Sequence, residues 1–452
     1  MNKINIKKIG IIGLGISGFD TGNFLLERGY QVYITEKNDN EEIREKANIL
    51  KDKGAKVEVG KHSTEFLKDV ELIVISPGID EKIEIVNFLK NRKIPIISEI
   101  ELAYRFSKSK KIIAITGTNG KTTTTTLIGH IFKKANLPSV VCGNIGNTFI
   151  GEIENINEET WIILEVSSFQ LEKIESFKPY ISCLLNIDYD HFDRYANMLE
   201  YLNAKKRIFE NQDINDICVL NFDDYYLKKI IKEIKGKKLF FSFSKIYPGA
   251  YYENGHIYLN LFKKLKLLDI KNIKIQGRGN ISNIMASSLI SYVCKIDTEI
   301  IKKAVESFEG LPHRMEKVAV IEGITFINDS KSTNPHSVKN SILSLKGENN
   351  IVLILGGKDK GFPYSQLKKY IKNRVKFIIL LGEAKERIRK ELYPLDVPME
   401  YVNDLKEAVS LSKKISKKGD FVLFSPGCSS FDMFKNYKER GDVFKKEVLS
   451  LL

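Results

Sequence analysis

The sequence predicts an α/β protein made of three domains in series, with parallel sheets covered by helices. Its 452 residues correspond to about three domains at ~150 residues each. Apolar β-branched runs alternate with amphipathic helical stretches over almost the whole chain, as in parallel α/β folds. A strand followed by a glycine turn and a helix occurs three times, near Gly13, Gly117 and Gly356. Three α/β units therefore account for both the length and the pattern.

Strands are predicted where short apolar runs are bounded by turn residues, and helices where apolar residues recur at helical spacing. The strand candidates are residues 8–12, 31–35, 72–76, 112–116, 161–166, 181–186, 351–355, 377–381 and 421–425, and the helix candidates include 17–28, 121–134 and 405–414. Residues 235–274 show Tyr/Phe alternation, so antiparallel strands are expected there, beside the central sheet. The polar, basic residues 105–111 and Pro312 mark the expected domain boundaries.

The composition is that of an ordinary globular protein and excludes several classes. Apolar residues make up 43% and charged residues 28%, which excludes a wholly disordered chain. The five cysteines include no C-x-x-C pair, which excludes zinc ribbons and thioredoxin-like sites and favours reduced, cytoplasmic thiols. No apolar run reaches ~18 residues, so no membrane span is expected. The net charge of +14 is spread along the chain, which favours a solvated surface and argues against a nucleic-acid partner.

The sharpest local motif is a phosphate-binding loop at residues 112–123, where Ile-Ile-Ala-Ile-Thr-Gly-Thr-Asn-Gly-Lys-Thr-Thr runs from an apolar strand into a helix. Glycines let backbone N–H groups close on phosphate oxygens, Lys121 can neutralise the β- and γ-phosphates, and Thr122 can bind Mg²⁺. Ile115 replaces the first glycine of the standard pattern. The strand, loop and helix context still favours phosphate binding over a structural turn.

A second glycine turn, Gly-Leu-Gly-Ile-Ser-Gly at residues 13–18, follows the first strand, and Glu36 lies at the end of the next one. By itself this pattern is typical of NAD binding, with Glu36 on the ribose. Turns with the same spacing also bind other diphosphates or only allow close helix packing. Because nothing elsewhere suggests a hydride-acceptor site, another diphosphate is favoured over NAD.

Polar segments follow later strands, at the sheet edge where ligands bind in such folds. Glu165 ends an apolar strand, and His191 lies in the acidic segment 186–194, so these two side chains could hold Mg²⁺ near the phosphate loop. The alternative for His191 is a surface histidine bonded within that loop. Further polar loops lie at 310–315, 328–334, 356–361 and 425–432. Cys428 in the last one lacks a neighbouring histidine and is interpreted as structural.

Taken together and in this order, the motifs resemble those of the Mur ligases, ATP-dependent enzymes that add amino acids to UDP-N-acetylmuramic acid. The resemblance runs from Gly13 to about Gly441. The phosphate loop is common to the family. The strings Glu-Val-Ser-Ser-Phe-Gln-Leu, Asp-His-Phe-Asp-Arg-Tyr and Ser-Pro-Gly-Cys-Ser-Ser-Phe-Asp-Met-Phe-Lys-Asn-Tyr are similar to those of the D-glutamate-adding branch.

The resemblance implies a fold, an activity and a location. It implies a Rossmann-like UDP-substrate-binding domain at 1–105, a central P-loop mononucleotide-binding domain that binds ATP at 106–311, and a Rossmann-like, amino-acid-binding C-terminal domain at 312–452. The implied reaction joins UDP-N-acetylmuramoyl-L-alanine and D-glutamate through an acyl phosphate, with ATP and two Mg²⁺ sites. It belongs to cytoplasmic peptidoglycan synthesis, and hence to cell shape and division, and a monomer is expected.

The family's site residues carry over onto matching positions of this sequence. Expected around the UDP-muramoyl substrate are Gly13, Leu14, Gly15, Ile16, Ser17, Thr35, Glu36, Lys37, Ser76, Pro77, Gly78, Asn144 and Ser167. Expected around ATP are Gly117, Thr118, Asn119, Gly120, Lys121, Thr122, Thr123, Asn283, Arg314, Asp329 and Lys331. Expected around D-glutamate are Thr333, Lys360, Ser430, Phe431 and Tyr437.

The implied catalytic residues are Lys121, Glu165, His191 and Lys205, and the implied metal ligands are Thr122, Glu165, His191 and Lys205 as a carbamate. Lys206 is the alternative assignment for the carbamylated lysine, although the Ala-Lys-x-Arg-Ile spacing favours Lys205. Two departures from the family matter. Gly279 stands beside Asn280 where a histidine is frequent, and Tyr437 stands where a phenylalanine is common.

Three alternatives remain at this point. One is a relative that adds another amino acid or extends folates, although the first glycine turn and residues 430–437 argue against it. Another, from a different class, is an NAD-binding dehydrogenase with a phosphate loop that takes no part in catalysis. The third is a non-catalytic nucleotide-binding module.

Overall fold

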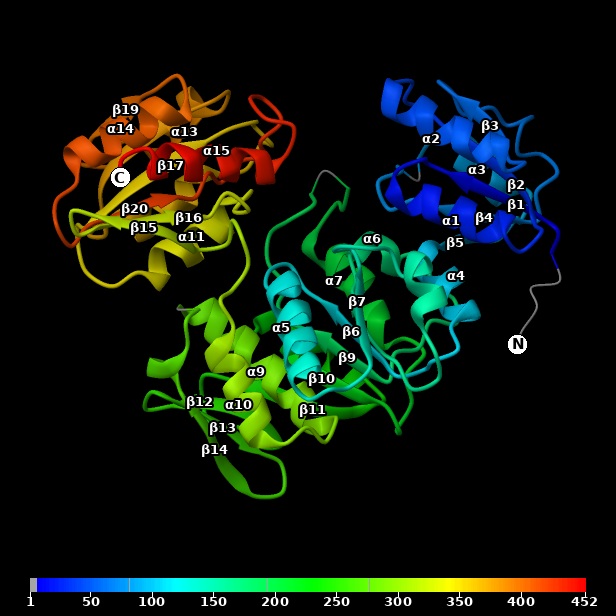
Figure 1. Ribbon diagram of the computed structural model, residues 1–452, viewed down its shortest axis with the longest axis horizontal. Helices are drawn as coiled ribbons and strands as arrows, with labels where there is room; N and C mark the ends of the chain where they lie inside the picture. Colours follow the sequence, from blue (N-terminus) through cyan, green and yellow to red (C-terminus); the bar gives the residue numbers. More distant parts are fainter. Residues whose placement is uncertain (1–5, 81, 193, 276) are drawn as a thin grey trace. The chain divides into compact units, whose positions relative to one another are not determined.

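The computed structural model describes residues 6–80, 82–192, 194–275 and 277–452, and strands within these ranges form three sheets (Figure 1). The first sheet is parallel, with the order β3-β2-β1-β4-β5. Its strands are β1 (Lys8–Ile12), β2 (Gln31–Glu36), β3 (Lys56–Val59), β4 (Leu72–Ile75) and β5 (Ile96–Ser98). Its helices are α1 (Ile16–Leu26), α2 (Glu41–Asp52), α3 (Glu84–Asn91) and α4 (Glu99–Phe106). Central strands such as β4 are buried along their length, as expected for a parallel sheet covered on both faces.

The second sheet has the order β14-β13-β12-β11-β10-β9-β6-β8-β7. Its strands are β6 (Ile112–Thr116), β7 (Ser139–Gly143), β8 (Trp161–Glu165), β9 (Ile181–Leu184), β10 (Ile217–Asn221), β11 (Lys237–Ser242), β12 (Gly249–Glu253), β13 (His256–Asn260) and β14 (Lys264–Asp269). The pairs β12–β13 and β13–β14 are antiparallel, so the antiparallel strands predicted for residues 235–274 are confirmed.

Helices or 3-10 turns separate the strands from β6 to β11, and two more helices follow β14. They are α5 (Lys121–Lys134), α6 (Ser168–Leu171), α7 (Met198–Lys206), α8 (Tyr225–Ile230), α9 (Arg278–Val293) and α10 (Thr298–Ser307), with short 3-10 turns η1 (Ile150–Asn155), η2 (Arg207–Phe209), η3 (Ile231–Glu233) and η4 (Ile270–Asn272). The predicted helix 121–134 therefore has the bounds that the structure shows. It begins at the phosphate loop because Gly120 takes the left-handed conformation at the helix N-cap.

The third sheet has the order β15-β16-β20-β17-β18-β19. Its strands are β15 (Glu316–Ile321), β16 (Ile324–Asn328), β17 (Ile351–Gly356), β18 (Val375–Leu381), β19 (Met399–Tyr401) and β20 (Phe421–Phe424), and only β15 pairs antiparallel. Its helices are α11 (Pro335–Ser344), α12 (Lys368–Ile371), α13 (Lys385–Leu392), α14 (Leu405–Ile415) and α15 (Tyr437–Leu449), with η5 (Tyr364–Leu367). Two apolar clusters pack on its two faces. The three-domain α/β fold is thus confirmed.

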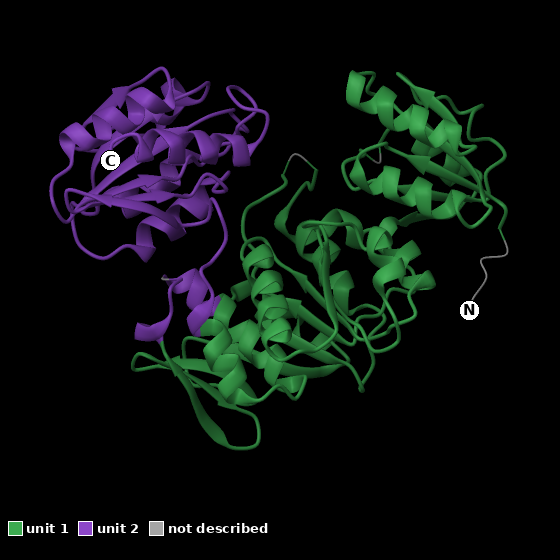
Figure 2. Ribbon diagram, viewed as in Figure 1, with its two compact units in different colours: residues 1–269, 283–305 green, residues 270–282, 306–452 purple. Residues whose placement is uncertain are grey.

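The chain divides into two compact units (Figure 2), one of residues 1–269 and 283–305, and one of residues 270–282 and 306–452. The first two sheets belong to the same unit, and α4 shows why. The Glu101 carboxylate on α4 accepts the backbone N–H groups of Glu175 at 2.9 Å and Phe177 at 2.8 Å, which lie between β8 and β9. One apolar cluster includes Ile9 of the first sheet and Leu220 of the second. The predicted boundary at residue 105 lies inside this bonded region and stays a prediction.

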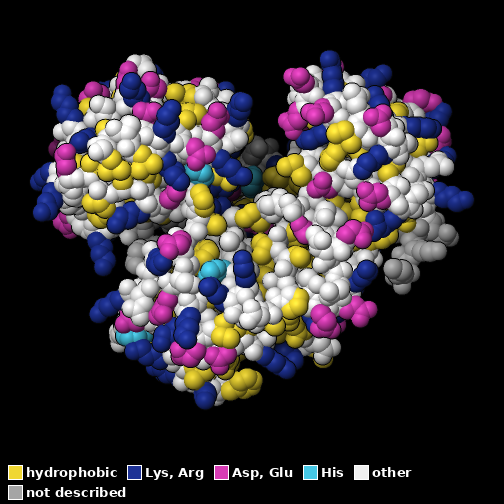
Figure 3. All heavy atoms as spheres, viewed as in Figure 1, with side chains coloured by type: hydrophobic (Ala, Val, Ile, Leu, Met, Phe, Trp, Pro, Cys, Tyr) yellow, Lys and Arg dark blue, Asp and Glu magenta, His cyan; other side chains and the backbone are white. Residues whose placement is uncertain are grey.

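Three further observations concern the helices, the cysteines and the surface. No helix within the described ranges is both long and apolar enough to cross a membrane. All five cysteines are free, and four of them are buried. On the face shown in Figure 3, lysine and arginine side chains are interspersed with acidic ones over both units, as in an ordinary solvated surface.

Candidate functional site

The phosphate loop lies between β6 and α5 and closes tightly on its neighbours. Gly117 has a φ of +150°, and a Cβ there would lie 3.0 Å from the Cβ of Leu185. Gly120 has a φ of +86°, and a Cβ there would lie 2.3 Å from Oδ1 of Asn283 on α9. Both positions therefore require glycine, for conformation and for space. The same contact places Asn283, an expected ATP residue, against the loop.

Asn186 holds this loop in place, and sequence reasoning did not single it out as a site residue. Its Oδ1 accepts the N–H of Asn119 at 2.8 Å, and its Nδ2 donates to the carbonyl of Asn119 at 2.9 Å. Its own carbonyl accepts the N–H of Thr118 at 2.9 Å. The sequence signal that could have identified it is an asparagine just after β9, because β9 lies beside β6, the strand that leads into the loop. These bonds use the N–H groups of Thr118 and Asn119 and hold the backbone of the loop in place before any ligand binds.

Lys121 folds back over the loop that it ends. Its Nζ donates to the carbonyls of Gly117 and Thr118, both at 2.8 Å. The ammonium group is therefore held at the mouth of the loop, where phosphates bind in such folds. Thr122 follows in the first turn of α5 and is half-buried, while Thr123 is buried.

Glu165 ends β8 and is only 2% exposed. Its Oε1 accepts the Nδ2 of Asn144 at 3.0 Å, and its Oε2 is buried without a hydrogen-bond partner. A buried carboxylate oxygen without a partner costs free energy unless a cation or donor meets it. Over the described part of the chain, no three His, Cys, Asp or Glu side chains are grouped to hold a metal. Mg²⁺ commonly takes one or two carboxylates and completes its shell with phosphates, so Glu165 suits Mg²⁺ bound together with a nucleotide.

The adjacent lysines of α7 have opposite environments. Lys205 is 1% exposed, and its Nζ lies 4.8 Å from the centre of the Tyr201 ring. Burial, and then the positive charge of Lys121, hold the pKa of Lys205 well below its usual range, against the opposing charges of Asp190 and Glu165. Lys206 points elsewhere, and its Nζ lies 2.6 Å from a carboxylate oxygen of Glu233. Lys205 is therefore the lysine that shares its electrostatic environment with Lys121 and Glu165.

His191 lies in the segment that follows β9, with a φ of +58°, a conformation that residues other than glycine rarely adopt. Its ring centre is 4.8 Å from that of Phe169 and 6.1 Å from that of Tyr201. The side chain is 40% exposed, and its Nε2 lies 3.6 Å from Oδ2 of Asp190. Asp193 of the same motif lies outside the described residues. The histidine is thus partly exposed to solvent and packs against aromatic rings. One of these rings, that of Tyr201, also contacts Lys205.

The expected substrate residues of the first domain gather at one edge of the first sheet. Residues 13–17 follow β1, residues 35–37 end β2, and residues 76–78 follow β4, and these three strands are neighbours. Gly13 has a φ of +97°, and a Cβ there would lie 2.8 Å from the side chain of Ser76.

Glu36 has both carboxylate oxygens engaged by backbone. Oε2 accepts the N–H of Leu14 at 2.7 Å, and Oε1 accepts the N–H of Asn38 at 2.8 Å. Each carboxylate oxygen can accept a second hydrogen bond, so these contacts fix the Glu36 side chain at the end of β2 and are compatible with a bound ribose or another diphosphate ligand. Thr35 is also engaged, because its Oγ1 donates to the carbonyl of Lys61 at 2.9 Å.

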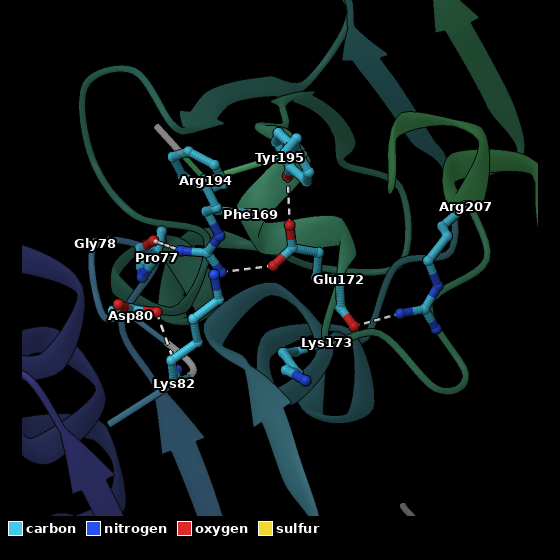
Figure 4. A pocket seen from close by; sticks show the side chains of 10 residues that line it. All are labelled: Pro77, Gly78, Asp80, Lys82, Phe169, Glu172, Lys173, Arg194, Tyr195 and Arg207. Atoms are coloured by element: carbon cyan, nitrogen blue, oxygen red, sulfur yellow. Dashed lines mark hydrogen bonds and ion pairs between the residues drawn. The ribbon is translucent and has the colours of Figure 1, made fainter. Parts of the chain in front are cut away.

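A pocket of about 590 Å³ lies beside residues 77 and 78 (Figure 4). The Arg194 guanidinium crosses it, donating to the carbonyls of Pro77 at 3.3 Å and Ile79 at 3.1 Å and to Glu172 at 2.5 Å. The pocket is lined by Pro77, Gly78, Asp80, Lys82, Phe169, Glu172, Lys173, Arg194, Tyr195 and Arg207. Its four basic side chains against two acidic ones suit an anionic ligand. Ser167 at the start of α6 instead uses its hydroxyl in a capping box with Gln170.

The remaining expected residues, Arg314 through Tyr437, belong to the second unit. Asp329 is buried, and its Oδ2 accepts the hydroxyls of Ser332 and Ser341 at 2.5 Å and of Ser425 at 2.8 Å. Burial raises the pKa of Asp329, and these bonds oppose that rise. This carboxylate therefore ties the loop after β16 to the loop after β20, and its contact with nucleotide stays a prediction.

Lys331 and the expected D-glutamate residues line the same edge of the third sheet. The Lys331 Nζ lies 4.0 Å from the centre of the Tyr437 ring. Ser430 is buried, whereas Phe431 is 71% exposed and Lys360 is exposed. The two positions expected to differ from the family are Tyr437 and Gly279. At Gly279 a Cβ would meet no atom within 4 Å, so the structure leaves open space there.

Comparison with known families matches three models in order along the chain. They are the Mur ligase MurD-like N-terminal domain at residues 7–98, the Mur ligase middle domain at 115–291 and the Mur ligase glutamate ligase domain at 313–428. UDP-N-acetylmuramoylalanine--D-glutamate ligase of Caldanaerobacter subterraneus subsp. tengcongensis is 41% identical, over 98% of this chain and 98% of that protein. The protein of the same name from Clostridioides difficile is 39% identical, over 98% and 99%.

Solved structures show the same fold at low identity. A pseudomurein peptide ligase type C from Methanothermus fervidus superposes with a TM-score of 0.61 at 19% identity, covering 98% of this chain and 99% of that one. MurF ligase from Thermotoga maritima, in complex with ADP, superposes with a TM-score of 0.60 at 17% identity, covering 99% and 97%.

Proposed function

This chain belongs to the Mur ligase family, and we propose that it joins D-glutamate to UDP-N-acetylmuramoyl-L-alanine with ATP, releasing ADP and phosphate. The observation that carries this proposal is 39–41% identity along 98% of the chain to relatives named for that reaction. The glycine loop that closes on Asn283 and Leu185 supports it, because phosphate binding needs such a loop.

The reaction proceeds in two steps on bound substrates. The L-alanyl carboxylate attacks the γ-phosphorus of ATP, so that ADP leaves and an acyl phosphate forms. The amine of D-glutamate then attacks the acyl carbon, loses a proton, and phosphate leaves as the amide forms. The chain supplies little covalent chemistry and acts by positioning and by charge. Lys121 exchanges its bonds to the carbonyls of Gly117 and Thr118 for bonds to phosphate oxygens.

Mg²⁺ would supply positive charge that stabilises the transferring phosphoryl group. Glu165 would hold one ion through its partnerless Oε2, with the hydroxyl of Thr122 beside the nucleotide phosphates. His191 would hold a second ion. The assignments of Glu165 and Thr122 are supported by their oxygen donors, which Mg²⁺ prefers, whereas that of His191 rests on the family resemblance.

Lys205 is proposed to be carbamylated. Its lowered pKa leaves a larger fraction of neutral amine, and only that form attacks carbon dioxide, forming an N–C bond and releasing a proton. The product is an anion, so the repulsion between the Lys205 and Lys121 ammonium groups is replaced by attraction. The carbamate oxygens would also be a further metal ligand. Burial of a bare ammonium beside Lys121 is costly, which favours the modification.

The three domains divide the substrates. We assign the UDP-substrate to residues 1–105, ATP to 106–311 and D-glutamate to 312–452, with a monomer as the working unit. Use of ATP and a UDP-sugar, which are made inside cells, supports a cytoplasmic location.

The test is phosphate release from ATP by the full chain with UDP-N-acetylmuramoyl-L-alanine and D-glutamate, L-glutamate, L-lysine or no amino acid. We expect release that requires both the UDP-substrate and D-glutamate. Release with another amino acid would keep the mechanism and overturn the substrate. Release that needs neither substrate would overturn the ligase.

A further inference from the structure

Arg440 is a buried arginine that the proposed chemistry does not use. It lies in the first turns of α15 and is 2% exposed. Within the described residues its guanidinium makes five hydrogen bonds, and every acceptor is a carbonyl or hydroxyl oxygen. A buried charge bonded only to neutral groups is costly to maintain, so a plain packing role would be served better by an apolar side chain.

The acceptors lie on two loops that are about 100 residues apart in sequence. On the loop after β16, Nη2 donates to the carbonyl of Ser330 at 2.7 Å and Nε to its hydroxyl at 3.0 Å. On the loop after β20, Nη1 and Nη2 donate to the carbonyl of Cys428, both at 3.1 Å, and Nη1 to that of Ser429 at 3.0 Å. One planar group thus ties two loops together, which a lysine ammonium could not do with the same geometry.

A third loop closes on the same group. A Cβ at Gly357, after β17, would lie 3.0 Å from Nη1 of Arg440 and 2.4 Å from the carbonyl of Ser429. Strand β20 lies between β16 and β17 in the sheet, so the three loops leave adjacent carboxyl ends. In open α/β sheets this edge is where ligands bind.

The tied loops carry five of the residues expected to bind nucleotide or D-glutamate. Asp329, Lys331 and Thr333 flank Ser330, and Ser430 and Phe431 follow Ser429. The Ser330 hydroxyl also donates to the carbonyl of Tyr437 at 2.8 Å, so the network reaches that position too. Burial lowers the pKa of Arg440 to about 10, which leaves it charged at neutral pH.

We propose that Arg440 is a positioning residue for the ligase reaction: it sets the spacing between the loop of Lys331 and Thr333 and the loop of Ser430. The positive charge under this edge also favours the two carboxylates of the amino acid. The expected change in KM rests on the proposed function. The expected change in hydrogen exchange does not depend on it.

The test compares Arg440→Lys with Phe444→Leu in the full chain. Phe444, one turn further along α15, is buried and stacks on Phe424 with 4.7 Å between ring centres, so its variant loosens the same helix without removing any of the five hydrogen bonds of Arg440. Two backbone amides report on the loops: Gly427 N–H donates to the carbonyl of Ser332, and Lys358 N–H donates to the carbonyl of Ser429. Without ligand, we expect the hydrogen-exchange rate of both amides to rise about tenfold in Arg440→Lys and to stay unchanged in Phe444→Leu.

In kinetics, Arg440→Lys should raise the KM for D-glutamate about tenfold and leave that for the UDP-substrate within about twofold, because the latter's expected residues lie in the first unit. Ser330→Ala, which removes one acceptor, should act in the same direction more weakly and serves if Arg440→Lys does not fold.

Unchanged exchange in both Arg440→Lys and Ser330→Ala would overturn the inference. So would an equal rise in KM in Phe444→Leu at matched loss of melting temperature, since that is what general loosening predicts. If the wild-type chain uses another amino acid, the proposed function fails, and the exchange experiment still decides the role of Arg440.

Discussion

Lys205 and Lys206 are adjacent in α7, and of the two only Lys205 is buried, where Lys121 and Glu165 act on its pKa. We expect Lys205→Arg to lower kcat at least about 100-fold, because an arginine cannot be carbamylated and leaves a cation where an anion is needed. Lys206→Arg keeps the surface charge beside Glu233 and should retain activity. Wild-type activity should fall in buffer stripped of carbon dioxide and return with bicarbonate. An active Lys205→Arg variant would contradict the carbamate assignment.

Glu99 of α4 provides a test of pH dependence. Burial raises its pKa to about 7, opposed by the N–H of Ile150, which donates to it at 2.6 Å. A raised carboxyl pKa means that the folded state holds a proton that the unfolded state has lost. This group's contribution to stability therefore decreases as pH rises from about 4.5 to 7.

Glu99→Gln removes that titration and keeps an oxygen for Ile150. We expect it to stabilise the protein by up to ~3 kcal/mol above pH 8, and by little near pH 4.5. Melting temperatures at the two pH values, with the exposed Glu41→Gln as a control, measure this. A stabilisation that is the same at both pH values would show that Glu99 does not titrate as described.

At the scale of elements, the turn from β6 to α5 determines the nucleotide site. Gly120→Ala would place a methyl group 2.3 Å from Oδ1 of Asn283 at a φ of +86°. We expect ADP affinity to fall more than about tenfold, because the loop must shift. Gly29→Ala is the matched control, with a φ of +78° and no atom within 4 Å of the added carbon. Titration calorimetry with ADP compares the two, and equal affinities would contradict the tight closure of the loop.

At the scale of the whole molecule, two compact units with separate apolar clusters are expected to unfold separately. Scanning calorimetry should resolve two transitions. ADP should raise the one that belongs to the phosphate loop, since a ligand stabilises the unit to which it binds. Glu99→Gln should move that same transition. A single transition shifted by both changes would show that the units unfold together.

Sequence patterns predicted most of the elements, because they depend on local apolar runs. The strand candidate at residues 112–116 is confirmed with the same bounds, and the candidates at 351–355 and 377–381 differ from the observed strands by one or two residues. The candidate at 181–186 is two residues too long, because the strand ends at Leu184 and Asn186 turns to hold the phosphate loop. The apolar run continues to Leu185, one residue past the strand. The strand ends where Asn186 bonds Asn119, which is distant in sequence and which the local pattern does not reveal.

The sequence by itself determined the three α/β domains, the phosphate loop and the family, because glycine spacing and strand patterns are local. Only the tertiary structure decided which groups meet. It gave Lys205 rather than Lys206 a buried site, engaged both oxygens of Glu36 with backbone, and left Oε2 of Glu165 without a partner. It also set Arg440 under two distant loops. These properties arise from burial and from contacts between segments far apart in the chain, which no local pattern records.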